Sequence, residues 1–340
     1  MKGEQKMSKI IKNLGGCLIT IIITLAFICN LGYIVRPIDT DGAFAQIDTF
    51  HNLPENSIDV IVYGSSHAFR GFNVMELYDK YGIGGYNYGF HWQQLNTTKM
   101  FLKDSLMTQN PKIVIIETYY AADVVNKSDM SAQVYYTRYL NNKEDRADYL
   151  KTCFEGNPRG YISYYFPLYA FHDNWSTLKE SSFSELQYGS NKMLYSMGVN
   201  TWDNGIVEEA IPDQGTQEQL SFDELALAEL DEIVSICREN NIDIIFFTNP
   251  YVGVYQYSEA MHEYANKNGC QYFNIFELID EVGINEDTDF NDAGHLNVAG
   301  ATKVADYIGE YINKNYELDD KRKIDGNLWE GKKVVYSPQN

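Results

Sequence analysis

Apolar residues in this chain form short runs, separated by longer stretches in which apolar positions recur with a helical period. Three runs are rich in β-branched residues: residues 58–63 (IDVIVY), 112–117 (KIVIIE) and 242–247 (IDIIFF). Runs of this kind predict strands that are buried on both faces of a sheet. Residues 86–88 and 271–274 predict two shorter strands.

The stretches between these strands predict helices. They cover residues 73–81, 93–107, 221–240, 258–268 and 297–315, with Ser221 and Glu224 at the spacing of a capping box. Strands that alternate with helices of this length predict a parallel sheet with helices on both faces. The expected fold class is therefore a three-layer α/β/α domain.

The first apolar stretch is longer than the others. Residues 14–35 contain no charged residue, and at about 1.5 Å per residue a helix of this length crosses the hydrocarbon of a bilayer. Lysines precede this stretch, so the positive-inside rule predicts a cytoplasmic N-terminus and an exported remainder. Three alternatives are a signal peptide cleaved near Ala43 and Ala45, a lipoprotein signal at Cys29, and a buried core helix.

The charge of the chain agrees with this division. The net charge is −20; five basic residues and one acid give residues 1–36 a charge of +4, so residues 37–340 carry −24. Such an acidic chain does not fit nucleic-acid binding, which needs a basic face. A content of 44% hydrophobic and 22% charged residues is typical of a folded protein, and five cysteines, an odd number, exclude a complete disulfide framework.

The sequence predicts three parts. Residues 1–36 form a cytoplasmic tail and transmembrane anchor, residues 37–315 the α/β domain, and residues 316–340 a polar C-terminal tail. Within the domain, residues 121–215 interrupt the alternation and are crowded with tyrosine and tryptophan. We expect most of these aromatic side chains to pack the insertion onto the core. A lid or groove that stacks on sugar rings is the alternative.

Two clusters of small or polar residues follow predicted strands at the start of the domain. Ser66 lies in the segment YGSSH, directly after the first strand and before a helix. A serine at this carboxyl edge lies beside the free backbone N–H groups of the helix, which can stabilise an oxyanion. Gly89 ends the second strand and could present its N–H to the same oxyanion. A plain turn is the alternative for each cluster.

A third cluster lies in a loop before the final helix. The spacing of Asp292 and His295 lets the carboxylate accept the Nδ1–H of the imidazole and leaves Nε2 to take a proton from a hydroxyl. The alternative is that Asp292 caps a turn and His295 is an ordinary surface residue. The sequence contains no H-E-x-x-H, no C-x-x-C and no phosphate-binding glycine loop, so no metal and no nucleotide cofactor is predicted.

The order Ser66, Gly89, then Asp292 and His295 before the last helix resembles that of the SGNH (GDSL-like) hydrolase superfamily. The resemblance covers residues 58–110, 112–120 and 242–312. The chain looks most similar to membrane-anchored, extracytoplasmic members that work on cell-wall or exopolysaccharide acyl groups, such as the teichoic-acid D-alanylation and alginate O-acetylation proteins. This resemblance implies a flavodoxin-like SGNH fold.

The resemblance also implies roles for individual residues. Ser66 would be the nucleophile, His295 the general base and Asp292 the acid that orients it. The N–H groups of Gly89 and Ser66 would form the oxyanion hole, and His67 would line the substrate site.

The chain departs from the family pattern in two places. Ser65 stands where many members have aspartate. The family's G-x-N-D block should follow residues 112–117, and this chain reads Glu117-Thr118-Tyr119-Tyr120 there. Asn249, after the next strand, is the candidate replacement for the missing oxyanion asparagine.

The expected function is that of a single-pass membrane protein with an extracytoplasmic serine esterase or O-acyltransferase domain that needs no cofactor. Its expected partners are a cell-wall or exopolysaccharide substrate and, by resemblance, a membrane-bound acyl exporter. One alternative is a glycan-binding or assembly module on the same fold with a vestigial triad. Another is a secreted, lipase-like esterase.

Overall fold

The computed structural model describes residues 2–35, 43–122, 134–178, 196–199, 201, 221–222, 224–250 and 257–332. The chain divides into two compact units. The anchor unit comprises residues 1–40 and 150–188, and the sheet unit comprises residues 41–149 and 189–340. Residues 150–188, predicted as part of an insertion in the α/β domain, group with the N-terminal helix, because helix α10 (Pro167–Phe171) packs against helix α1 (Lys2–Ile34).

The sheet unit contains a parallel sheet of five strands in the order β2-β1-β3-β4-β5. The strands are β1 (Val60–Tyr63), β2 (Gly85–Asn87), β3 (Ile113–Glu117), β4 (Asp243–Thr248) and β5 (Gln271–Asn274). This confirms the five predicted strands to within two residues at each end. The order is that of a flavodoxin-like sheet, in which ligands bind where the strand order reverses, between β1 and β3.

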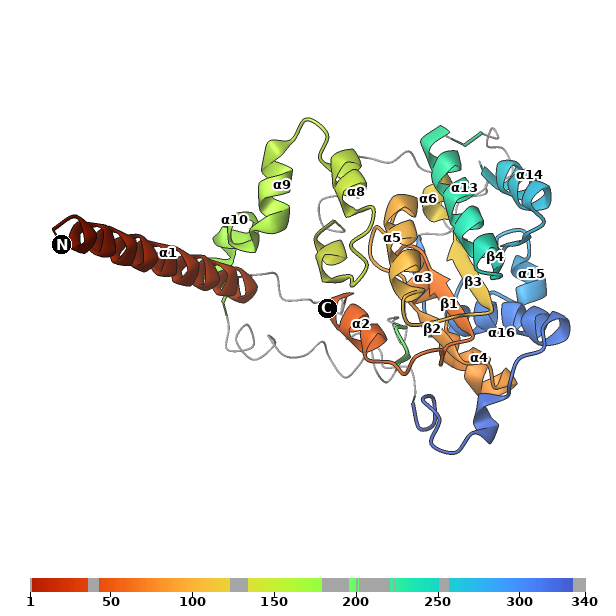
Figure 1. Ribbon diagram of the computed structural model, residues 1–340. Helices are drawn as coiled ribbons and strands as arrows, with labels where there is room; N and C mark the ends of the chain where they lie inside the picture. The colour runs from red at the N-terminus through yellow and green to blue at the C-terminus, as the bar shows by residue number, and fades with distance from the viewer. Residues whose placement is uncertain are drawn as a thin grey trace. The chain divides into compact units, whose positions relative to one another are not determined.

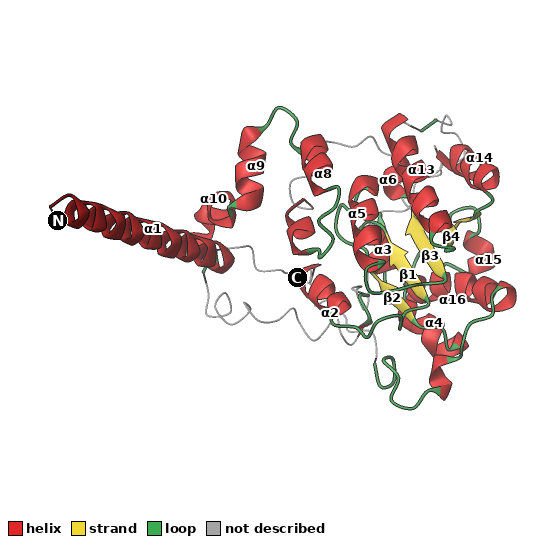
Figure 2. Cartoon of the chain, in the orientation of Figure 1, coloured by secondary structure: helices red, strands yellow, loops and turns green. Residues whose placement is uncertain are grey.

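Helices cover both faces of this sheet (Figures 1 and 2). Helices α4 and α16 contact each other, as do α5 and α13, and right-handed crossovers place the two pairs on opposite faces. The main helices are α3 (Ser66–Gly71), α4 (Val74–Tyr81), α5 (Leu95–Ser105), α13 (Glu224–Glu239), α14 (Ser258–Asn268), α15 (Ile279–Val282) and α16 (Val298–Asn315). The predicted α/β class and parallel sheet are therefore confirmed.

The ends of these helices follow local capping chemistry. The Asn73 side chain accepts a hydrogen bond from the Met75 N–H at the start of α4, and Gly82 ends that helix in the left-handed conformation. Helix α13 is described from Glu224 onwards, and the residue directly before it lies outside the described residues, so the capping box of Ser221 and Glu224 stays a prediction.

The outer edge of strand β2 is covered by parts of the chain that are not strands. Trp329 donates its Nε1–H to the Gly85 carbonyl at 3.0 Å, and Asn87 donates its N–H to the Met197 carbonyl at 2.8 Å. The Gln46 side chain donates to the Asn87 carbonyl. Trp329 is only 2% exposed, so the described part of the predicted C-terminal tail packs onto the domain instead of extending from it.

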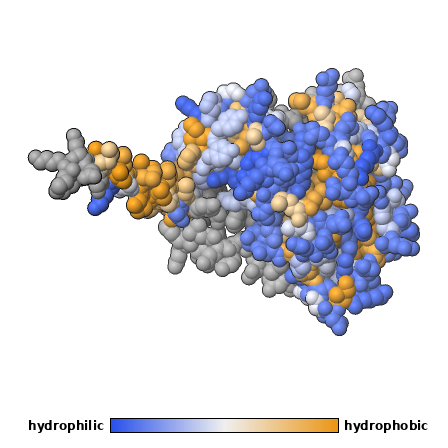
Figure 3. All heavy atoms as spheres, viewed as in Figure 1, coloured by the Kyte–Doolittle hydropathy of each residue, from blue (hydrophilic) through white to orange (hydrophobic). Residues whose placement is uncertain are grey.

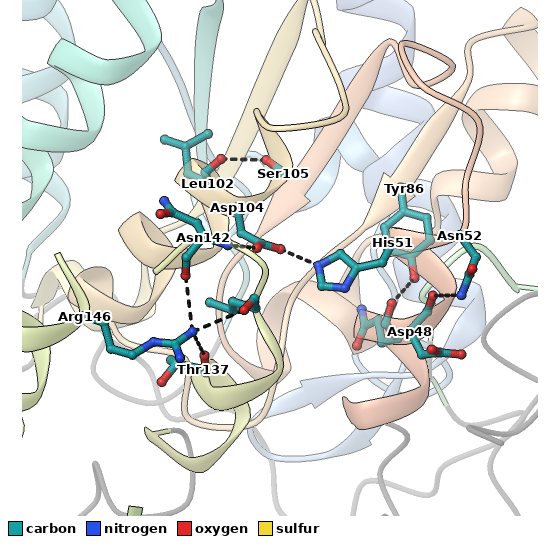
Figure 4. Close-up of polar contacts among 12 residues, drawn as sticks. Asp48, His51, Asn52, Tyr86, Leu102, Asp104, Ser105, Thr137, Asn142 and Arg146 are labelled. Atoms are coloured by element: carbon teal, nitrogen blue, oxygen red, sulfur yellow. Dashed lines mark hydrogen bonds and ion pairs between the residues drawn. The ribbon is translucent and has the colours of Figure 1, made fainter. Parts of the chain in front are cut away.

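Helix α2 (Ala43–His51) and residues 134–146 attach to helix α5 through one buried carboxylate (Figure 4). Asp104 accepts a hydrogen bond from the His51 ring at 2.6 Å and another from the Asn142 N–H at 2.8 Å. Arg146 holds the same loop by donating to three backbone carbonyls, including that of Thr137. This part of the predicted insertion therefore packs onto the core.

The anchor unit begins with helix α1 (Lys2–Ile34), whose surface is largely hydrophobic (Figure 3). Its segment Lys9–Gly32 is long and apolar enough to cross a membrane, and none of its most apolar stretch is buried in the protein. This exposure does not fit the alternative that the segment is a buried core helix. Length and composition here are typical both of a membrane span and of a signal sequence.

Candidate active site

The serine half of the site follows strand β1. Gly64 has φ = 145°, and a Cβ atom there would lie 2.6 Å from Glu117 Cβ, so only glycine fits. The Ser65 side chain then caps helix α3 by accepting from the His67 N–H at 3.2 Å. This makes Ser66 the first residue of the helix, where its N–H has no intrahelical acceptor. Ser66 is half-buried.

A buried acid at the end of β3 holds this turn in place. Glu117 Oε2 accepts hydrogen bonds from Ser65 Oγ at 2.8 Å and from Ser65 N at 3.3 Å, while Oε1 accepts from Tyr119 N at 2.7 Å. Burial raises the pKa of Glu117 from its ordinary 4.5 to about 7, although the hydrogen bonds from Ser65 and Tyr119 act in the opposite direction. One carboxyl group thus joins the ends of the two central strands.

The histidine half is a tight hairpin between α15 and α16. Strands β6 (Phe290–Asp292) and β7 (His295–Leu296) are antiparallel, and their register places Asp292 directly opposite His295. Asp292 Oδ1 lies 2.9 Å from His295 Nδ1 and also accepts from Gly294 N at 2.8 Å. The carboxylate therefore fixes which ring nitrogen of the histidine carries its proton.

Asn297 ties this hairpin to the helix that follows it. Its Oδ1 accepts from Ala299 N at 2.9 Å and Gly300 N at 3.2 Å, which caps α16. Its Nδ2 donates to the carbonyls of Thr288 at 2.7 Å and Phe290 at 3.3 Å. The same buried side chain thus starts a helix and holds strand β6.

The two halves meet at the carboxyl edge of the sheet. Ser66 Oγ lies 2.8 Å from His295 Nε2, across a sequence separation of 229 residues. Partial burial would raise the pKa of Asp292, but its hydrogen bond to His295 and the charge of that ring lower it well below its ordinary value. The structure therefore brings Ser66, His295 and an ionised Asp292 together in one hydrogen-bonded chain.

His67 lies between the two halves. Its ring stacks on His295 with centroids 4.8 Å apart and on Tyr119 with centroids 4.5 Å apart. Burial and the neighbouring His295 lower the pKa of His67 well below its ordinary value, and Asp292 opposes this only in part. A neutral imidazole is therefore packed against the ring that would act as base.

The other two predicted oxyanion residues have partners within the protein. The Gly89 N–H donates to Asn87 Oδ1 at 3.1 Å. Gly89 also lies close to the serine turn, since a Cβ atom on it would be 3.0 Å from the Gly64 carbonyl oxygen. Asn249 Nδ2 donates to the carbonyls of His67 at 2.8 Å and Gly71 at 3.4 Å. Asn249 thus binds helix α3 to the end of β4. Of the predicted oxyanion donors, the Ser66 N–H lies in the first turn of α3, where backbone N–H groups have no acceptor within the helix.

Three residues around the site were not singled out from the sequence: Glu117 as the support of the serine turn, Tyr119 as the surface behind His67, and Asn297 as the support of the hairpin. An acid as the last residue of an otherwise apolar strand is a usable signal for Glu117, because burial of an unpaired carboxylate is costly. Across the ranges that the structure describes, no group of three or more histidine, cysteine or acidic residues is arranged to hold a metal ion.

No protein-family model matches the chain, and no curated protein matches it. The function of the chain is therefore inferred from the geometry of the site.

Proposed function

We propose that this protein is an extracytoplasmic, serine-dependent O-acyl esterase or O-acyltransferase with an SGNH-type site. The observation that carries the proposal is the chain from Ser66 Oγ to His295 Nε2 at 2.8 Å and from His295 Nδ1 to Asp292 Oδ1 at 2.9 Å. A nucleophile, a base and a group that orients the base are the minimum for acyl transfer through a covalent intermediate.

The first half-reaction forms an acyl-enzyme. Ser66 Oγ attacks the ester carbonyl carbon while its proton passes to His295 Nε2, and Asp292 stabilises the imidazolium through Nδ1–H. The Ser66 N–H supports the developing oxyanion. His295 then gives the proton to the leaving alkoxide, which departs as an alcohol.

The second half-reaction uses the same groups in reverse. Water, or a hydroxyl of a polysaccharide, gives its proton to His295 and attacks the acyl carbonyl carbon. The bond to Ser66 Oγ breaks, and the serine recovers a proton from the imidazolium. Because His67 is held neutral, its ring adds no positive charge that would oppose protonation of His295.

The location and the substrate class complete the proposal. Helix α1 would anchor the chain in the cell membrane with its sheet unit outside, where cell-wall or exopolysaccharide acyl groups are available and a membrane-bound exporter could supply an acyl donor. Trp92, in the loop after β2, is 52% exposed, and an aromatic face of this kind suits stacking on a sugar ring.

The decisive experiment is active-site labelling with a fluorophosphonate, followed by mass spectrometry of the modified peptide. We expect Ser66 to be labelled and Ser66→Ala to lose both labelling and turnover of a chromogenic acetyl ester, by at least about 10³-fold. Ser235→Ala is the matched control, since Ser235 is exposed on α13. Undiminished turnover by Ser66→Ala would overturn the mechanism.

A second candidate function is a glycan-binding or assembly module with an inactive triad. The observation that favours it is that the Gly89 N–H and the Asn249 amide both donate hydrogen bonds to acceptors within the protein. Few donors are then left for an oxyanion. Retained binding of isolated wall polymer, without labelling of Ser66, would favour this second function.

A further inference from the structure

The anchor unit has an exposed patch of apolar side chains on helices α9 (Pro158–Tyr165), α10 (Pro167–Phe171) and η2 (His172–Thr177). We call it the aromatic patch; its members are Ile162, Tyr165, Phe166, Tyr169 and Trp175, each between 44% and 56% exposed. Ile162 and Tyr165 lie on α9, Phe166 lies between α9 and α10, Tyr169 lies on α10 and Trp175 on η2, so all five belong to one short stretch of the chain, residues 162–175. Exposed apolar residues that are grouped in this way usually mark a contact surface.

The patch lies beside the C-terminal end of helix α1. A Cβ atom on Gly32 would lie 2.9 Å from the Leu168 backbone nitrogen and 3.0 Å from Pro167 Cβ, so α10 packs closely on α1 at this point. Asn174, the residue before Trp175, donates its Nδ2–H to the Val35 carbonyl at 3.0 Å. Figure 1 shows α10 against the same end of α1.

This position corresponds to a particular depth in a bilayer. The candidate span is Lys9–Gly32, so a chain anchored by α1 leaves the hydrocarbon close to Gly32. Tyrosine and tryptophan concentrate at that boundary, because each has a large apolar ring and a polar group that stays hydrated.

The charge of the segment also suits a lipid surface. Residues 158–178 contain one arginine, Arg159, and one acid, Asp173, within a chain whose net charge is −20. The segment is therefore not repelled by anionic headgroups in the way that the rest of the exported chain is.

We infer that the aromatic patch is a membrane-contact surface that lies in the headgroup region of the outer leaflet. The inference rests on the membrane anchoring that the proposed function assigns to α1, and its partner is the lipid bilayer. Contact along α9 and η2 adds a second point of attachment beside the span, and so restricts rotation of the anchor unit about the axis of α1.

The test measures the depth of Trp175. The full chain is reconstituted into phosphatidylcholine–phosphatidylglycerol vesicles with or without bromine on the acyl carbons nearest the headgroup, and tryptophan emission is recorded. Brominated lipid should quench the wild-type protein, and Trp175→Phe should lose that quenching. Trp92→Phe is the matched control: Trp92 is 52% exposed against 51% for Trp175, but belongs to the sheet unit, so its replacement should leave the quenching unchanged.

Washing the vesicles with alkaline carbonate separates this inference from the anchor itself. Protein that resists the wash but shows no quenching dependent on Trp175 would overturn the aromatic patch alone. That result would point instead to a protein partner for the patch, since the vesicles contain none. Protein released by the wash would overturn the anchor and the patch together.

Discussion

The two halves of the candidate site are built in different ways. The serine half follows strand β1 of the parallel sheet. Ser65, which precedes Ser66 in the turn, and Glu117, which accepts hydrogen bonds from Ser65, are only 2% and 3% exposed. The histidine half is a hairpin of two short strands in which the side chains of His295 and Asp292 are 25% and 48% exposed. The proposed nucleophile is therefore positioned by the core, and the proposed base by a few local hydrogen bonds.

Because of this difference, we expect mutations in the two halves to have different main effects, on catalysis in one and on stability in the other. Changes in the histidine half should impair catalysis with little cost in folding, because its acid and base are partly hydrated. Changes beneath the serine half should alter the free energy of unfolding, because Glu117 is buried among the central strands.

The largest expected effect comes from removing the base. His295→Ala should lower kcat by about 10⁴-fold, and Asp292→Asn by about 10²-fold, since water can reach the half-exposed position of the acid. Steady-state turnover of an acetyl ester measures both.

His262→Ala is the matched control for this pair, because His262 forms a similar contact with Glu277 at 2.9 Å on the surface and should leave kcat unchanged. A loss in Asp292→Asn that equals or exceeds the loss in His295→Ala would contradict the picture of a loosely held acid.

The next effect concerns the stability of the serine half. The pKa of Glu117 is about 7 in the folded chain against an ordinary 4.5, so between these values the folded state holds a proton that the unfolded state has released. Raising the pH from 4.5 to 7 should therefore destabilise the wild type relative to Glu117→Gln, by about 3 kcal/mol at most.

Denaturant unfolding of both proteins across this pH range measures the difference. Tyr272, on β5, is the titratable neighbour that the charge of Glu117 affects, and burial raises its own pKa far above this range. A stability difference that does not change between pH 4.5 and 7 would show that Glu117 does not titrate there.

The smallest effect separates the two roles of Asn297. Asn297→Ser keeps a good N-cap for α16 but loses the amide that binds the hairpin, so kcat should fall roughly tenfold and the free energy of unfolding by about 1 kcal/mol. Asn297→Ala should lose the cap as well and destabilise the protein by about 1 kcal/mol more. Equal stability of the two variants would argue against the cap.

Much of the fold could be predicted from the sequence, because buried parallel strands have a plain signature. The β-branched runs ending at Tyr63 and Glu117 correspond to β1 and β3, which are wholly buried. Ser66, Asp292 and His295 could be proposed because each follows or precedes an element whose type was clear. Ser66 lies at the carboxyl edge of the parallel sheet because it follows β1, and the hairpin between α15 and α16 brings Asp292 and His295 to it.

Other features depend on contacts that no local pattern encodes. Glu117 stood out in the sequence only as a departure from a family motif, whereas its role comes from Ser65, 52 residues away. The segment around Trp329 is polar in composition, and a single tryptophan does not predict that it covers Gly85, 244 residues away. Tyr188 and Trp202 of the predicted insertion lie outside the described residues.

The covering of strand β2 has a consequence for how copies of this protein meet. A bare edge strand offers a row of N–H and C=O groups to which a strand of another molecule can add, and such addition leads to aggregation. Here the Gly85 carbonyl and the N–H and carbonyl of Asn87 are already bonded to Trp329, Met197 and Gln46, none of which lies in a strand. At high local concentration, these groups are not available for intermolecular β-pairing.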